Sequence, residues 1–178
     1  TRPLIMGVLN LTPDSFSDGG KYNEKDLALK RVEYMVESGA DIIDIGAESS
    51  RPGAEIISVN DERARLEPTL KEIKKVFDVP ISIDTYKPEI MELSIDYGVD
   101  MINDIYALQK PGTIEVISNS NALVCLMHMQ NSPKNMQNSP YYKNIILEVE
   151  SFFKARTADL NKAGIKNERI MLDPGFGF

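Results

Sequence analysis

Short apolar runs alternate with longer amphipathic segments along the whole chain. The apolar runs are rich in β-branched residues and have the length of buried strands, and they cover residues 4–9, 41–45, 81–83, 100–102, 122–127 and 169–172. The intervening segments have helical periodicity and cover residues 26–37, 61–76, 88–97, 112–118 and 142–163. The pattern therefore predicts strands and helices in strict alternation.

Strict alternation of strands and helices predicts an α/β fold with a parallel sheet and right-handed crossovers. Periodicity alone is compatible with a doubly wound sheet and with a (β/α) barrel. The doubly wound alternative has little support, because no G-x-G-x-x-G sequence follows the first apolar run. No linker interrupts the pattern, so we expect one domain over residues 1–178.

Polar side chains stand at the carboxyl end of each predicted strand. In a parallel barrel these ends surround one mouth, which is where such folds place their chemistry. A single polar residue at such a position is more often a cap or a turn residue, but six strands ending in this way favour a shared site. The residues are Asn10, Asp44, Asp84, Asn103, His128 and Asp173.

The composition and charge of the chain argue against some classes of protein. The chain has 178 residues, 42% of them hydrophobic, and a formal net charge of −7, which is typical of a globular domain that nucleic acid or an acidic membrane surface would repel. No apolar run has transmembrane length, and the first three residues do not resemble a signal peptide, so we expect a cytoplasmic protein. Cys125 is the only cysteine, which we interpret as an inert buried thiol.

Six motifs occur in order over practically the whole chain. They are residues 10–20 (NLTPDSFSDGG), 44–53 (DIGAESSRPG), 83–86 (IDTY), 102–104 (IND), 126–130 (LMHMQ) and 172–177 (LDPGFG). Together these motifs resemble the dihydropteroate synthase family. This resemblance implies a TIM (β/α)8 barrel, of which the chain holds the first six strands, while the seventh and eighth are absent from this sequence.

The resemblance implies a transferase of folate biosynthesis. Its reaction condenses p-aminobenzoate with 6-hydroxymethyl-7,8-dihydropterin pyrophosphate and gives 7,8-dihydropteroate and pyrophosphate. One alternative is the pterin-binding domain of a corrinoid-dependent methyltransferase, which would not need the loop at residues 13–18. Another is a non-catalytic synthase-like module, since the family pocket is completed by Lys, Arg and His residues beyond Phe178. We therefore expect the 178 residues alone to be inactive.

The resemblance also assigns a pterin site. It implies that Asp84, Asn103 and Asp173 bind the pterin, whose pyrimidine edge offers adjacent N–H donors to a carboxylate. Asp84 has a second implied role with Asp18, because both match residues that stabilise the cationic pterin formed when pyrophosphate departs.

A metal and a second substrate complete the implied site. Asn10 matches a residue near the pyrophosphate and its Mg²⁺, an ion that prefers oxygen ligands. Phe16, Ser50, Arg51 and Pro52 match positions that form the p-aminobenzoate pocket. Ser50 departs from the family, which more often has Thr there.

The remaining expectations concern the single histidine and the partners of the chain. We interpret His128 as an orienting or packing residue, because no second His or Cys lies at metal-ligand spacing. The partners we expect are the two small-molecule substrates, with no nucleic acid and no membrane, and the full-length family is commonly a homodimer. The resemblance makes the protein a candidate sulfonamide target, with its sensitivity left open.

Overall fold

The computed structural model describes residues 2–12, 21–49, 55–130 and 141–176. Strands and helices alternate throughout these residues. The strands are β1 (Met6–Asn10), β2 (Ile42–Gly46), β3 (Ile81–Asp84), β4 (Met101–Asp104), β5 (Leu123–Met127) and β6 (Ile170–Asp173). The helices are α1 (Lys21–Glu37), α2 (Val59–Val76), α3 (Pro88–Asp96), α4 (Thr113–Ser118) and α5 (Ile145–Lys162), with a 3₁₀ turn, η2 (Asn167–Arg169), before β6.

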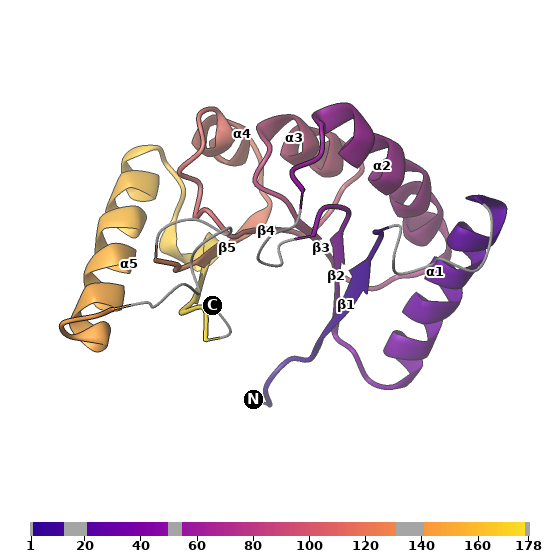
Figure 1. Cartoon of the computed structure of the whole chain (residues 1–178), viewed down its shortest axis with the longest axis horizontal. Coiled ribbons are helices and arrows are strands. Elements are labelled where there is room, and N and C mark those ends of the chain that lie inside the picture. The colour runs from indigo at the N-terminus through magenta and orange to yellow at the C-terminus, as the bar shows by residue number, and fades with distance from the viewer. Residues whose placement is uncertain (1, 13–20, 50–54, 131–140, 177–178) are drawn as a thin grey trace.

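The strands form one parallel sheet in which each strand pairs with its neighbours in the chain, in the order β1-β2-β3-β4-β5-β6. Figure 1 shows this sheet curved, with the helices in an arc around its convex side. A doubly wound sheet reverses its strand order and carries helices on both faces, whereas sequential order with helices outside is the arrangement of a (β/α) barrel. The structure therefore confirms the predicted fold class.

The hydrophobic core lies between the sheet and the helices. Alternate strand residues such as Ile43, Ile45 and Ile83 are fully buried in it, together with helix residues such as Leu70. Successive side chains of a strand point to opposite faces. The strand residues that alternate with these isoleucines therefore face the concave side of the sheet. That concave face carries the polar residues discussed below.

Two of the helices begin at residues that favour a helix start. The Ser58 hydroxyl accepts a hydrogen bond from the backbone N–H of Asp61 at 3.1 Å and caps α2. Pro88 occupies the first turn of α3, where its missing N–H costs nothing, as the sequence predicts. The boundaries otherwise differ from prediction by a few residues, and most at α1, which begins five residues before the predicted start at Asp26.

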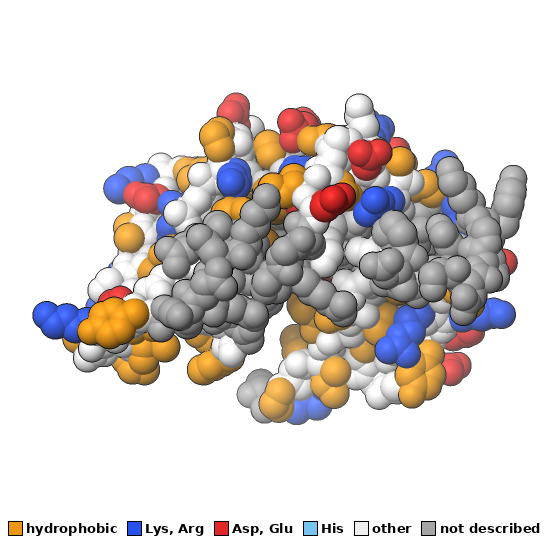
Figure 2. Space-filling model, in the orientation of Figure 1, with side chains coloured by type: hydrophobic (Ala, Val, Ile, Leu, Met, Phe, Trp, Pro, Cys, Tyr) orange, Lys and Arg blue, Asp and Glu red, His pale blue; other side chains and the backbone are white. Residues whose placement is uncertain are grey.

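Apolar side chains are exposed along both edge strands. Leu4 and Val8, before and within β1, are 70% and 54% exposed, and Leu172 in β6 is 49% exposed. Figure 2 shows hydrophobic side chains gathered below the start of β1 and around the first turn of α5. Among the described residues, neither edge strand has a partner on its outer side.

In the described part of the chain, no helix combines the length and the apolar character needed to cross a bilayer.

Candidate active site

A row of side chains crosses the concave face near the carboxyl ends of the strands. The register places Asn10, Gly46, Asp84 and Asn103 side by side on β1 to β4. The row continues through β5 and β6 with Cys125 and Met171. Three of the predicted site residues therefore share one level of one face, although they are spread over most of the chain.

Gly46 leaves room for two of these side chains to approach each other. A Cβ atom at this position would lie 3.5 Å from Asp84 Oδ2 and 3.8 Å from Asn10 Oδ1. The carboxylate and the amide oxygen therefore converge above the same glycine. The structure thus brings the predicted metal ligand, Asn10, close to the predicted pterin residue, Asp84.

Asn103 is tied to a carboxylate on the other side of β3. Its Nδ2 atom donates a hydrogen bond to Asp44 Oδ2 at 3.3 Å. Asp44 lies one level below the row, where the register pairs it with Ser82 of β3. We predicted Asp44 at a strand end, and this was wrong: it occupies the middle of β2, because that strand continues to Gly46.

Asp173 lies at the end of β6, on the same face and beyond the row. Its backbone oxygen accepts a hydrogen bond from the His128 N–H, and its Oδ1 atom accepts one from the Gly175 N–H, both at 2.8 Å. Gly175 has a φ of +69°, and a Cβ there would lie 2.2 Å from the His128 carbonyl oxygen. The turn after β6 therefore fixes one oxygen of Asp173 through a glycine that no side chain can replace without movement.

Burial and mutual repulsion shift the acidic groups of this face. Burial raises the pKa of Asp84 well above its usual value, and the nearby carboxyl of Asp44 raises it further. Burial likewise raises the pKa of Asp44, opposed by Ser82 and Asn103. On the opposite face of β4, burial raises the pKa of Asp104 to about 6, although the N–H groups of Tyr106 and Leu108 oppose this change. A ligand that brings N–H donors or positive charge would relieve the repulsion.

A buried charged cluster beside the row was missed by the sequence analysis. Lys87 Nζ lies 2.5 Å from Glu62 Oε2 and also contacts Glu48, while its third partner is the Ile57 carbonyl at 2.9 Å. The Thr85 hydroxyl donates to Glu62 Oε1 at 2.8 Å. Burial lowers the pKa of Lys87, but its bonds to the two glutamates outweigh burial and raise it.

Strand-end position was the signal that could have found this cluster. Glu48 follows β2 by two residues, and Lys87 follows β3 by three. The cluster connects the segments that follow these strands with the first turns of α2, beside the mouth.

His128 is buried, as its expected packing role requires, whereas Cys125 is only partly buried on the concave face and so differs from the buried thiol that we expected. The His128 ring is 8% exposed and contacts the Phe152 ring edge-on at 5.0 Å between centroids. Burial lowers its pKa, so the neutral ring is a packing group among aromatic residues. Burial raises the pKa of the Cys125 thiol, and the carboxylates of the face raise it further, which disfavours a reactive thiolate.

Five predicted site residues lie outside the described residues. These are Phe16, Asp18, Ser50, Arg51 and Pro52. Within the described residues, no group of three or more acidic, His or Cys side chains could hold a metal ion. Asn10 and Asp84 offer oxygen atoms of the kind that Mg²⁺ prefers, and this ion commonly takes one or two protein oxygens and completes its shell with water and substrate phosphate.

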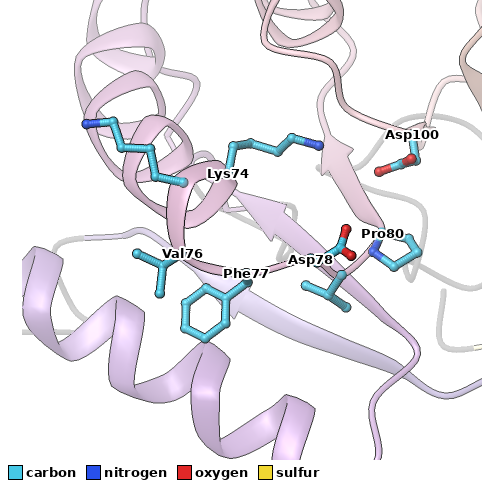
Figure 3. A pocket seen from close by; sticks show the side chains of 8 residues that line it. Lys74, Val76, Phe77, Asp78, Pro80 and Asp100 are labelled. Carbon is cyan, nitrogen blue, oxygen red and sulfur yellow. The ribbon is translucent and has the colours of Figure 1, made fainter.

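A surface pocket of about 340 Å³ lies at the opposite end of the sheet. Figure 3 shows its lining side chains where α2 ends and the chain enters β3. Two of its polar groups are already engaged: Lys74 Nζ donates to the Gly98 carbonyl at 2.7 Å, and Asp100 Oδ2 accepts from the Ile81 N–H at 2.9 Å. Because barrel enzymes carry their chemistry at the carboxyl ends of the strands, the concave row is the better candidate.

The chain is similar in sequence to known proteins. The profile of the family described as pterin binding enzyme matches residues 6–178. The dihydropteroate synthase of Escherichia coli K12 is 47% identical over 178 residues, which cover all of this chain and 63% of that protein. The enzyme of Haemophilus influenzae is 47% identical over 99% of the chain and 64% of its own length. The chain thus spans less than two thirds of these relatives.

Solved structures show the same similarity. Yersinia pestis dihydropteroate synthase, in a sulfonamide drug complex, superposes with a TM-score of 0.92 at 46% identity and covers 99% of this chain and 64% of its own. The Burkholderia cenocepacia enzyme, complexed with 7,8-dihydropteroate, has a TM-score of 0.86 at 43% identity over 99% and 60%. The Xanthomonas albilineans enzyme with 4-aminobenzoic acid has a TM-score of 0.91 at 40% identity over 99% and 63%.

Proposed function

Because the chain belongs to the family of pterin-binding enzymes, we propose that it supplies the pterin site of a dihydropteroate synthase. Its six strands form the larger part of a TIM barrel, which has eight strands when closed. The proposed reaction joins p-aminobenzoate to 6-hydroxymethyl-7,8-dihydropterin pyrophosphate and releases 7,8-dihydropteroate and pyrophosphate.

The observation that carries this proposal is the acceptor-rich row on the concave face. Asp84 and Asn103 are paired residues of neighbouring strands. Asp173 accepts the Gly175 N–H with Oδ1, which leaves its second carboxylate oxygen to accept from a ligand. A pterin edge presents several N–H donors, which carboxylate and amide oxygens accept. Such donors also offset the burial and the repulsion from Asp44 that raise the pKa of Asp84. Pterin binding is therefore the recognition that this set of residues favours.

The chemical step needs charge stabilisation and no nucleophile from the protein. The bond between the pterin methylene carbon and the pyrophosphate oxygen breaks, and pyrophosphate leaves with the electron pair. The cation left on the pterin is stabilised by the ionised Asp84 carboxylate. The amine lone pair of p-aminobenzoate then forms the new C–N bond, and one N–H proton is lost to solvent or to pyrophosphate. The family resemblance implies that Asp18 would also stabilise this cation.

We propose Mg²⁺ as the metal for this site, with the Asn10 side chain as its ligand. When bound, such an ion would supply charge neutralisation to pyrophosphate. By resemblance, Phe16, Ser50, Arg51 and Pro52 would form the p-aminobenzoate pocket, and a sulfonamide would compete there. A homodimer and a cytoplasmic location stay predictions.

The proposal is tested on the parent polypeptide with a closed barrel. We expect pyrophosphate release that requires both substrates and stops when Mg²⁺ is chelated. Asp84→Asn should lower turnover by roughly a hundredfold or more, as loss of a charge-stabilising group commonly does. The matched control is Asp96→Asn, an exposed position on α3, which should leave turnover unchanged.

Two other outcomes would replace this proposal. Pterin binding without pyrophosphate release would indicate a non-catalytic module. Methyl transfer from a methylated pterin to a corrinoid would indicate the methyltransferase alternative.

A further inference from the structure

Asp44 is a buried carboxyl group to which the proposed reaction gives no role. It is 5% exposed and lies in the middle of β2, on the concave face and one level below the row. A buried carboxyl is costly unless it is hydrogen-bonded. Its presence beneath the proposed pterin site therefore calls for a physical explanation.

The contact with Asn103 provides that explanation. Asp44 Oδ2 accepts the hydrogen bond from Asn103 Nδ2 at 3.3 Å, and the bond reaches from β2 to β4 across β3. A carboxylate oxygen accepts hydrogen bonds and donates none, so the amide must turn its NH₂ group toward Asp44. Asn103 Oδ1 is then directed away from Asp44, and the orientation of the amide is set.

Asp44 also raises the pKa of Asp84, but in the described part of the chain Asn103 Nδ2 is the donor with a hydrogen bond of good geometry to its carboxyl. Asp44 Oδ1 and Ser82 Oγ are both buried and make no hydrogen bond of good geometry there. The Ser82 hydroxyl is nevertheless close enough to lower the Asp44 pKa. A protonated Asp44 would still keep one oxygen that accepts from Asn103, so the orientation of the amide survives a change in charge.

We propose that Asp44 is a positioning residue that holds the Asn103 amide with Oδ1 facing the mouth, where it accepts a hydrogen bond from a pterin N–H. This inference rests on the proposed function. Without the acceptor at position 44, the Asn103 amide can rotate by half a turn. Its NH₂ group would then face the pterin N–H groups, and neither side would accept a hydrogen bond. The site would then lose its selection for an N–H at this point of the ligand.

The test compares two substitutions of Asp44 in the full-length polypeptide. Asp44→Leu removes the acceptor at similar volume, whereas Asp44→Asn removes the charge and retains an amide oxygen that accepts. We expect Asp44→Leu to weaken binding of 6-hydroxymethylpterin, measured by calorimetry, roughly tenfold, as loss of one buried hydrogen bond does. Asp44→Asn should stay within about threefold, because it rescues the acceptor. The control Asp78→Asn, at an exposed position of the opposite end, should have no effect.

A double-mutant cycle distinguishes positioning from a general structural effect. In an Asn103→Ala background, Asp44→Leu should cause no further loss of affinity, since it acts through Asn103 alone. An equal loss in both backgrounds would overturn the inference. So would an Asp44→Asn variant as weak as Asp44→Leu, since that result would make charge the cause.

The side-chain amide of Asn103 gives a readout that needs no pterin. In the wild-type protein we expect one of its two N–H protons to exchange slowly with solvent in NMR spectra, and we expect Asp44→Leu to abolish that protection. If the wild-type protein binds no pterin, the proposed function is wrong. The NMR signals of Asn103 then still test whether Asp44 sets the orientation of its amide. Unchanged Asn103 signals in Asp44→Leu would contradict the inference whatever the protein binds.

Discussion

Lys87 on the β3–α3 connection lies 2.5 Å from Glu62 in the first turns of α2, and both side chains are at most 10% exposed. The same ammonium group contacts Glu48 after β2. Two carboxylates therefore share one cation in a poorly solvated place, and removal of that cation leaves both uncompensated.

Lys87→Met should accordingly destabilise the protein by about 3–5 kcal/mol, the usual result of breaking a buried ion pair on one side. Urea unfolding at neutral pH measures the change. Lys71→Met, at an exposed position of α2, is the control and should change the free energy of unfolding by less than about 0.5 kcal/mol. Equal effects of the two substitutions would contradict a stabilising role for the cluster.

Gly175→Ala should be far more harmful than Gly164→Ala. Both glycines have positive φ, +69° and +85°, but a Cβ at 175 meets the His128 oxygen at 2.2 Å, whereas a Cβ at 164 meets nothing within 4 Å. We expect a loss of about 1 kcal/mol at 164 from backbone strain alone, and of roughly 2–5 kcal/mol at 175 from strain plus overlap.

The same pair separates stability from function. Gly175→Ala should also weaken binding of the pterin, because it displaces the turn that fixes Asp173. Calorimetry at a temperature where both variants are folded measures this. Gly164→Ala should bind the pterin as the wild type does, and a loss of affinity there would count against the proposed link between the β6 turn and the site.

Asp84→Asn should make the unliganded protein more stable at pH 7. A carboxyl whose pKa is raised by folding binds its proton more tightly in the folded state, so stability is greatest below the unfolded pKa near 4 and falls as pH rises above it. The substitution removes this penalty. Unfolding measured at pH 7 and at pH 3.5 should show a gain for Asp84→Asn at the higher pH and little difference at the lower one.

The 178-residue chain alone should release little or no pyrophosphate and should associate in solution. Its two edge strands lack outer partners among the described residues and carry exposed apolar side chains, a combination that promotes edge-to-edge association. A polypeptide longer by roughly two βα units should be monodisperse and active. Light scattering and pyrophosphate release test this, and robust turnover by the short chain would contradict it.

Periodicity and strand-end chemistry predicted the α/β class and three residues of the row. The hydrophobic pattern located each strand of the sheet, and parallel pairing then placed Asn10, Asp84 and Asn103 together because their register follows from the strand ends. The family resemblance added the barrel and its expected substrates. These features depend on local sequence, which is why they could be predicted.

Strand-end position could have marked Glu48 and Lys87 as candidates, but the partners within the charged cluster and the Asp44–Asn103 bond could not be predicted in the same way. Lys87 meets partners 39 and 25 residues away, and Asn103 meets one 59 residues away. Such contacts depend on how the strands curve and on which rotamers fit, and neither leaves a periodic signal. The misplacement of Asp44 arises because β2 extends one residue beyond its predicted end, to Gly46, which leaves Asp44 in the middle of the strand.

The order of the strands has a consequence for synthesis of the protein on the ribosome. Each strand pairs with the one made just before it, so Met6 meets Ile42 and Ile43 meets Ile81, at separations of fewer than forty residues. Every contact of the sheet can therefore form soon after its second strand emerges, without waiting for a distant segment. We expect the nascent chain to grow as a lengthening arc, with a single advancing edge that each new βα unit covers in turn.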